Sequence, residues 1–178
     1  SVDNRPPLMR EIADPSYSAV GIRFEVNKIY PDRVNSLPLV YLGSVRTAQC
    51  QEVYADLDVN YVLTCGRKLD PIIIEGMNWK ELPLDDLPTE DISPFFEEAI
   101  QFIDDAIRHN RGILVHCFAG LSRSVTVTIA YMMRTQGLTR DEALARIRET
   151  RPAARPNAGF METLWKFEIE LRRKGIVP

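Results

Sequence analysis

The residues with the clearest chemical capacity are a cysteine and, six positions later, an arginine, Cys117 and Arg123. The cysteine follows a short apolar run with β-branched members, residues 113–115, which is typical of a buried strand. Beyond the arginine, apolar side chains recur at helical spacing, at Val125, Ile129, Met132 and Met133. The pattern predicts a strand, a short loop that contains Gly120, and a helix that begins near Arg123.

A loop between a strand and a helix can bind an anion through its main chain. Its successive N–H groups and the positive end of the helix dipole both favour a phosphate dianion. We expect Arg123 to complete this cradle, whose amides come from Phe118, Ala119, Gly120, Leu121 and Ser122. The same positive groups favour the ionised form of the Cys117 thiol, which is its nucleophilic form. A thiolate beside an anion trap predicts cleavage of phosphate esters.

A single cysteine after an apolar run is more often a small buried side chain without any chemistry. That interpretation must also account for His116 before the cysteine and for Gly120, Arg123 and Ser124 after it, all at the point where a strand gives way to a helix. Because the residue types and their structural context agree, we favour the catalytic interpretation.

The order His-Cys, five residues, Arg-Ser at 116–124 resembles the signature loop of the cysteine-dependent protein tyrosine phosphatase superfamily. The Ala-Tyr-Met-Met sequence at 130–133 makes it most similar to the dual-specificity branch, and the similarity extends over about residues 25–174. The resemblance implies a metal-independent phosphatase, without a cofactor, that binds a phosphate or another oxyanion. It also implies hydrolysis of phosphotyrosine and phosphoserine/threonine esters through a cysteinyl-phosphate intermediate.

A leaving alkoxide or phenoxide needs a general acid, and the loop itself contains none. A proline-flanked stretch upstream, residues 79–88, contains two aspartates, Asp85 and Asp86. The resemblance implies an acid in such a loop about 30 residues before the cysteine and selects Asp86, with Asp85 as the alternative. An aspartate in a loop is otherwise commonly a solvated turn residue.

Other residues take supporting roles in this prediction. The hydroxyl of Ser124 can donate to the sulfur and help the thiolate leave, or it can cap the helix. By resemblance, His116 braces the loop through hydrogen bonds to the backbone rather than by proton transfer. Also by resemblance, Asn157 supports the loop from the side, with capping of the last helix as the alternative. Cys65 is interpreted as an inert buried thiol, with disulfide trapping of an oxidised Cys117 as the alternative.

Departures from related branches favour a protein substrate. The loop lacks lysines at positions 118, 119 and 121, which phosphoinositide-directed relatives use against additional phosphates. By resemblance this suggests a shallow pocket that accepts phosphotyrosine as well as phosphoserine and phosphothreonine. Two alternatives stay open: a phosphoinositide or other non-protein phosphatase of the same superfamily, and a catalytically idle phosphopeptide-binding module.

Composition narrows the class of protein. The chain has 178 residues, of which 45% are hydrophobic and 26% charged, as expected for one globular domain. Its net charge of −3 argues against a nucleic-acid surface, and no apolar run approaches the roughly 20 residues of a membrane span. Three irregularly spaced cysteines argue against a disulfide framework or a metal site. They favour a reducing compartment, the cytoplasm or alternatively the nucleus. The resemblance implies phosphoproteins as partners, with protein kinases as an open possibility.

Turn signals divide the chain into an amino-terminal extension, residues 1–24, and a catalytic domain, residues 25–178. Strands are predicted at 26–29, 39–42, 60–64, 72–74, 79–82 and 113–115, with Trp79 in the core. Helices are predicted over 45–56 with Ser44 as the N-cap, from Ser93, from near Arg123, from the capping box at Thr139, and over the closing stretch 160–171. This alternation predicts a single α/β domain with a central mixed, mostly parallel β-sheet flanked by helices.

Overall fold

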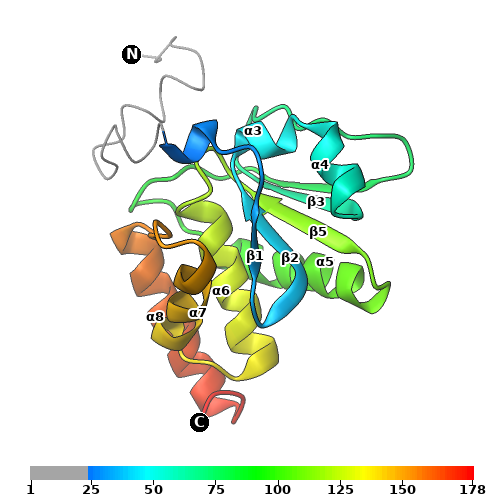
Figure 1. Ribbon diagram of the computed structural model, residues 1–178. Coiled ribbons are helices and arrows are strands. Elements are labelled where there is room, and N and C mark those ends of the chain that lie inside the picture. The colour runs from blue at the N-terminus through cyan, green and yellow to red at the C-terminus, as the bar shows by residue number, and fades with distance from the viewer. Residues whose placement is uncertain (1–23) are drawn as a thin grey trace, which may run out of the picture.

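A five-stranded sheet runs through the centre of the computed structural model, which describes residues 24–178 (Figure 1). Its strands, in chain order, are β1 (Asp32–Val34), β2 (Leu37–Gly43), β3 (Val59–Cys65), β4 (Asn78–Leu82) and β5 (Gly112–His116). Across the sheet the order is β1-β2-β5-β3-β4, and only the pairing of β1 with β2 is antiparallel. The predicted mixed, mostly parallel sheet is confirmed.

Strand β5 lies in the middle of the sheet, and all its residues are buried. Its Val115 lies opposite Leu42 of β2 and Leu63 of β3. A parallel strand covered on both faces needs apolar side chains on both faces, which explains the continuous run Ile-Leu-Val. Because β2, β3 and β5 are parallel, their carboxyl ends meet at one edge of the sheet, the usual location of ligand sites in α/β folds.

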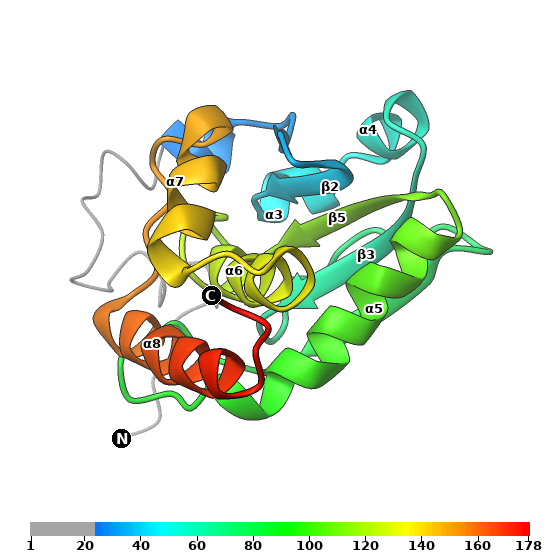
Figure 2. The same cartoon turned by 90° about the horizontal axis from the view of Figure 1, so that it is seen from below.

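Helices cover both faces of the sheet (Figures 1 and 2). The short helices α3 (Val45–Ala48) and α4 (Gln51–Asp56) lie on one face. On the other lie α5 (Phe96–Arg108), with the 3₁₀ turn η1 (Ser93–Phe95) before it, and α6 (Arg123–Gln136). The helices α7 (Arg140–Thr150) and α8 (Ala158–Arg173) pack against α6. Helix α6 is therefore enclosed, and its residues from 123 to 133 are all buried.

Two predicted helix starts are confirmed, and a glycine ends a third helix. The Ser44 hydroxyl accepts the N–H of Arg46 and caps α3. Thr139 and Glu142 form the predicted capping box of α7. Helix α6 ends at Gly137, whose φ of 66° is the left-handed conformation that glycine adopts without strain.

Two predicted strands are wrong. Residues 24–27 form a short helix, where a strand at 26–29 was expected, and Val26 is covered by the loop that follows β5 rather than by a neighbouring strand. Residues 72–74 are irregular, and the side chains of Ile72 and Ile74 are exposed. The reason is that β4 already pairs with β3 at this side of the sheet, so the 72–74 run has no strand beside it.

Smaller corrections concern boundaries and burial. The helix predicted over 45–56 is broken at Cys50, whose extended backbone starts α4 anew. Ser93 is not an N-cap but the first residue of η1, whose cap position is Ile92, and its N–H and hydroxyl both donate to the carboxylate of Asp91. Trp79 is 47% exposed instead of lying in the core. Within residues 24–178, no helix combines the length and the apolar character of a membrane-spanning segment.

Candidate active site

The 117–123 loop leaves the middle of the sheet edge, directly after β5, and ends in the first turn of α6. Cys117 is 2% exposed, and its Sγ lies 3.2 Å from the hydroxyl of Ser124. Arg123 is the first residue of α6 and is equally buried. The structure thus brings together the cysteine, the arginine and the serine that the sequence singled out, at the amino end of an enclosed helix.

Four consecutive carbonyls of the loop are tied to groups outside it. The Phe118 carbonyl accepts the N–H of Val45 at 2.9 Å, and the Leu121 carbonyl accepts the N–H of Arg155 at 2.7 Å. Between them, the carbonyls at 119 and 120 accept bonds from the Arg151 guanidinium at 3.0 and 2.7 Å. In a trans peptide the N–H points away from the carbonyl, so the amides that follow are turned toward the opposite, inner side of the loop.

Gly120 is required for this conformation. Its φ of +72° is left-handed, and a Cβ there would lie 2.5 Å from the carbonyl oxygen of Gly43. Any side chain would therefore push the loop away from the end of β2.

Arg151 is the residue that sequence analysis missed. It lies just after α7, is 2% exposed, and directs its side chain at the outer surface of the loop. Its charge is met by Asp32 at 2.7 Å and by Glu25 at 2.9 Å. The only local signal was an arginine before a proline at a helix end, which is common in proteins without any such role.

The guanidinium of Arg123 is held from two other segments. Its Nη1 donates to the carbonyl of Leu84 at 3.2 Å, which links it to the stretch that contains the two aspartates. Gly66, directly after β3, leaves room for it, because a Cβ there would lie 2.7 Å from Nη1. Arg123 is therefore oriented by residues that come long before it in the chain.

The two candidate acids have different surroundings. Asp86 is 7% exposed, and its Oδ1 accepts the side-chain amide of Asn157 at 2.9 Å. Asp85 is exposed and forms an ion pair with Arg67 at 2.9 Å. Asp86 is thus the aspartate that is fixed in place, whereas Asp85 lies on the surface.

Asn157 combines the two roles that the sequence left as alternatives. Its Oδ1 accepts the N–H of Phe160 and caps α8, and its own N–H donates to the Ser122 hydroxyl at 2.9 Å. Two residues later, a Cβ on Gly159 would lie 1.9 Å from the carbonyl oxygen of Pro88. The start of α8 therefore contacts both the 117–123 loop and the aspartate-containing stretch.

A hydrogen-bonded chain leads from the surface to the cysteine. Because the Cys117 carbonyl can only accept, Nδ1 of His116, 3.1 Å away, carries the proton. Nε2 then accepts from the Thr64 hydroxyl at 2.8 Å, and the Thr64 oxygen accepts the indole N–H of Trp79 at 2.9 Å. Burial lowers the pKa of His116 to about 4, which keeps the ring neutral and in this tautomer.

The sequence is similar to a known family and to several known proteins. Residues 40–170 match the family described as dual specificity phosphatase, catalytic domain. The chain is 40% identical over 141 residues to dual specificity protein phosphatase 9 of Homo sapiens, covering 78% of this chain and 37% of that protein. It is 38% identical over 133 residues to dual specificity protein phosphatase 1 of Arabidopsis thaliana, covering 75% of this chain and 67% of that one. The chain belongs to the dual specificity phosphatase family.

Solved structures agree with this assignment. The crystal structure of human DUSP28 superposes with a TM-score of 0.75 at 32% sequence identity, covering 80% of this chain and 95% of that one. Most of the first curated relatives are longer proteins, and the present chain matches only between 33% and 37% of their length. The relationship therefore concerns the catalytic domain, and we call the 117–123 loop the phosphate loop from here on.

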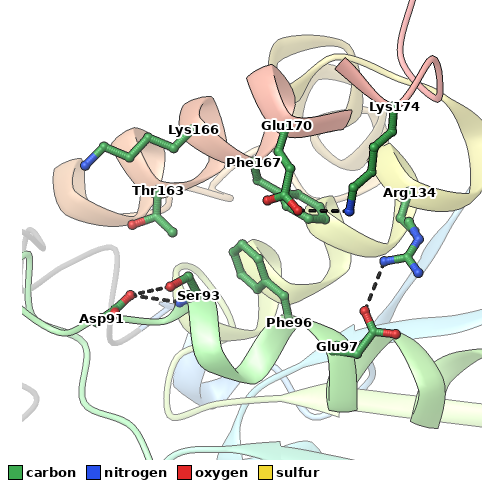
Figure 3. Close-up of a pocket in the computed structure, with 10 residues that line it drawn as sticks. All are labelled: Asp91, Ser93, Phe96, Glu97, Arg134, Thr163, Lys166, Phe167, Glu170 and Lys174. Atoms are coloured by element: carbon green, nitrogen blue, oxygen red, sulfur yellow. Dashed lines mark hydrogen bonds and ion pairs between the residues drawn. The ribbon is translucent and has the colours of Figure 1, made fainter. Parts of the chain in front are cut away.

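Two other features of this dual specificity phosphatase domain are not part of the site. Burial raises the pKa of the Cys65 thiol, and electrostatic interaction with Cys117 nearby raises it further, which favours the inert interpretation. A surface pocket of about 620 Å³ lies between α5, α6 and α8 (Figure 3), lined by none of the predicted site residues. Four of its charged residues are paired within it, Glu97 with Arg134 and Glu170 with Lys174. Residues 24–178 contain no cluster of three or more side chains suited to a metal.

The buried histidine predicts a pH dependence of stability. Its pKa is about 4 in the folded chain and about 6.5 when unfolded, so between these values only the unfolded chain takes up the proton. The stability that the neutral ring contributes is fully present above pH 6.5 and is lost as the pH falls toward 4. The free energy of unfolding decreases by about 3 kcal/mol in total over this range. Urea unfolding should show the stability advantage of wild type over His116→Gln shrinking by that amount between pH 7 and pH 4. Parallel pH profiles would contradict the burial of a neutral ring.

Proposed function

We propose that this chain is a metal-independent protein phosphatase that hydrolyses phosphotyrosine and phosphoserine/threonine esters through a cysteinyl-phosphate intermediate. The observation that carries the proposal is the main chain around Cys117. Four of its carbonyls are bonded to groups outside the loop, which leaves the amides of the loop and the Arg123 guanidinium as the donors for a bound phosphoryl group. Such a row of fixed donors matches the equatorial oxygens of a phosphoryl group under attack.

In the first step, the Cys117 thiolate attacks phosphorus, and the bond from phosphorus to the ester oxygen breaks. Asp86, protonated at the start, gives its proton to the departing oxygen, so the alcohol or phenol leaves neutral. The amides of the phosphate loop and the two-pronged guanidinium of Arg123 hold the three non-bridging oxygens. The hydrogen bond from Asn157 supports this role for Asp86, because it holds the carboxyl in one orientation.

In the second step, water attacks the cysteinyl-phosphate. The Asp86 carboxylate takes a proton from the water, phosphorus forms its new bond to oxygen, and the sulfur leaves as a thiolate. A hydrogen bond from Ser124, 3.2 Å from Sγ, stabilises the charge that develops on that sulfur. Inorganic phosphate departs, and both the thiolate and the protonated aspartic acid are restored.

The substrates belong to the same proposal. Curated relatives carry the name dual specificity protein phosphatase, which supports phosphoproteins as substrates, with protein kinases among the candidate partners. We assign the catalytic domain to residues 25–178. The extension before it, at 1–24, lies almost entirely outside the described residues. We place the action of this domain in the cytoplasm or the nucleus. A non-protein phosphatase is disfavoured because the phosphate loop has no lysines, and an idle binding module is disfavoured because Asp86 and Ser124 are both held in place.

The nucleophile is tested by substitution. Cys117→Ser should abolish hydrolysis of para-nitrophenyl phosphate, because a serine hydroxyl is not ionised at neutral pH. Wild type should remain active in the presence of a chelator, and Cys50→Ser, which changes a cysteine remote from the loop, should retain full activity. Activity that survives in Cys117→Ser and disappears with chelator would rule out the mechanism. Phosphopeptides and phosphoinositide vesicles, assayed side by side, separate the protein phosphatase from its non-protein alternative.

The general acid is tested by varying the leaving group. Asp86→Ala should lower kcat by about 10²- to 10⁴-fold for aryl phosphates whose phenols are weak acids. The loss should be small for phenols acidic enough to leave without a proton. Asp85→Ala, which removes a neighbouring exposed carboxylate, should change neither. If the two variants behave in the opposite way, Asp85 is the acid.

The positioning of that acid has its own test. Asn157→Ser keeps a good N-cap for α8 but removes the amide that donates to Asp86. Loss of the hydrogen bond that orients Asp86 should lower kcat by about 10-fold, again mainly for poor leaving groups. Thermal denaturation should show little change relative to wild type. A uniform loss across all leaving groups would mean that Asn157 acts on the phosphate loop instead.

A further inference from the structure

The phosphate loop is supported by a segment that precedes the part of the chain matching the family. The match begins at residue 40, whereas residues 24–30 reach the loop directly through Val26 and, by way of Arg151, through Glu25. Val26 packs against a small apolar cluster whose buried members are Val45, Leu69, Phe118, Ala119 and Leu121. Three of these five belong to the phosphate loop itself, so the 24–30 segment contacts the loop directly.

The same segment provides a charge to the loop's main support. The Glu25 side chain is 6% exposed, and its Oε2 lies 2.9 Å from Nη2 of Arg151. That nitrogen also donates to the Ala119 carbonyl, while Nε donates to the Gly120 carbonyl. One guanidinium edge is therefore shared between a carboxylate from the 24–30 segment and two carbonyls of the loop.

The segment is fixed in its place. The Ser44 hydroxyl donates to the Lys28 carbonyl at 3.4 Å, and the Thr47 hydroxyl donates to the carbonyl of Ile29. Lys28 forms an ion pair with Asp32 at 2.8 Å, and Asp32 is the second carboxylate on Arg151. The segment is thus bound to α3, whose Val45 N–H holds the first of the four outward carbonyls.

Electrostatics give Glu25 a specific role. A buried guanidinium is retained only where its charge is compensated and its donors are satisfied. Asp32 compensates from the Nη1 side, which faces away from the two carbonyls. Glu25 compensates at Nη2, the nitrogen that also binds the loop. Its Oε2 forms an ion pair there without a hydrogen bond, so its negative charge attracts this edge of the guanidinium and holds it beside the carbonyls.

We propose that Glu25 is a positioning residue of the phosphate loop, acting through Arg151, and that the functional catalytic unit begins at the 24–30 segment. This inference rests on the proposed phosphatase function, since it assigns the support of the same site. Without Glu25, Arg151 can turn toward Asp32, the carbonyls at 119 and 120 are released, and the amides that follow them are no longer aimed at the oxyanion.

The test uses the full chain and a probe that does not need turnover. Tungstate, a tetrahedral oxyanion, is titrated by calorimetry into wild type, Glu25→Ala, Glu25→Gln and Tyr30→Phe. Tyr30→Phe is the matched control, because it removes a hydrogen bond of the same segment, to Asp56, without touching Arg151. Glu25→Ala should weaken tungstate binding by between about 10- and 100-fold and lower kcat/KM by a similar factor. Glu25→Gln, which keeps the size of the side chain but removes its charge, should lose about as much affinity as Glu25→Ala, and Tyr30→Phe should match wild type.

Two further measurements separate an effect of Glu25 on the phosphate loop from a general loss of folding. In an Arg151→Met background, Glu25→Ala should cause no additional loss of tungstate affinity, because the two residues act as one unit. Hydrogen exchange of the amides at 118–123, measured below the thermal midpoint of each variant, should be faster in Glu25→Ala than in Tyr30→Phe even if a variant binds no anion. Unchanged tungstate affinity and unchanged exchange in folded Glu25→Ala would overturn the proposal. A wild type that binds tungstate but has no turnover would overturn the proposed function and leave this inference intact.

Discussion

The outward direction of four consecutive carbonyls, at residues 118–121, is the constraint on which the site depends. A free loop would expose a mixture of donors and acceptors to an anion, and the acceptors would repel it. Each carbonyl is instead bound by a group from another part of the chain, supplied by Val45, Arg151 and Arg155. Anion binding by this loop is therefore a property of the tertiary structure, although the residues that define it are contiguous.

The grouping of the cysteine, the arginine and the serine could be predicted from the sequence because all three lie within one short stretch of the chain. Cys117, Arg123 and Ser124 follow a buried strand and begin a helix, so local pattern alone brings them together. The alternation of strands and helices and the caps at Ser44 and Thr139 were also readable, since they depend on residues a few positions apart. The mixed sheet follows from the same alternation.

What the sequence did not reveal depends on distant neighbours. Arg151 is one of many arginines until the fold brings it behind the phosphate loop. The run at 72–74 has the composition of a strand, but β4 already occupies the position beside β3. Trp79 has a large apolar ring, yet its indole N–H bonds Thr64 while nearly half of its surface stays exposed. In each case the outcome depends on which distant segment lies beside the residue in the folded chain, and local propensity contains no information about that neighbour.

The stretch with the two aspartates is attached at three separated points. The Leu84 carbonyl binds Arg123, Asp86 binds Asn157, and the Pro88 carbonyl rests directly on Gly159. This stretch thus loses its conformational entropy during folding rather than each time a substrate binds. Under the function proposed above, a small aryl phosphate and a large folded protein would therefore meet the same preassembled arrangement of acid, arginine and cysteine, and would differ only in how well each phosphate reaches the cysteine.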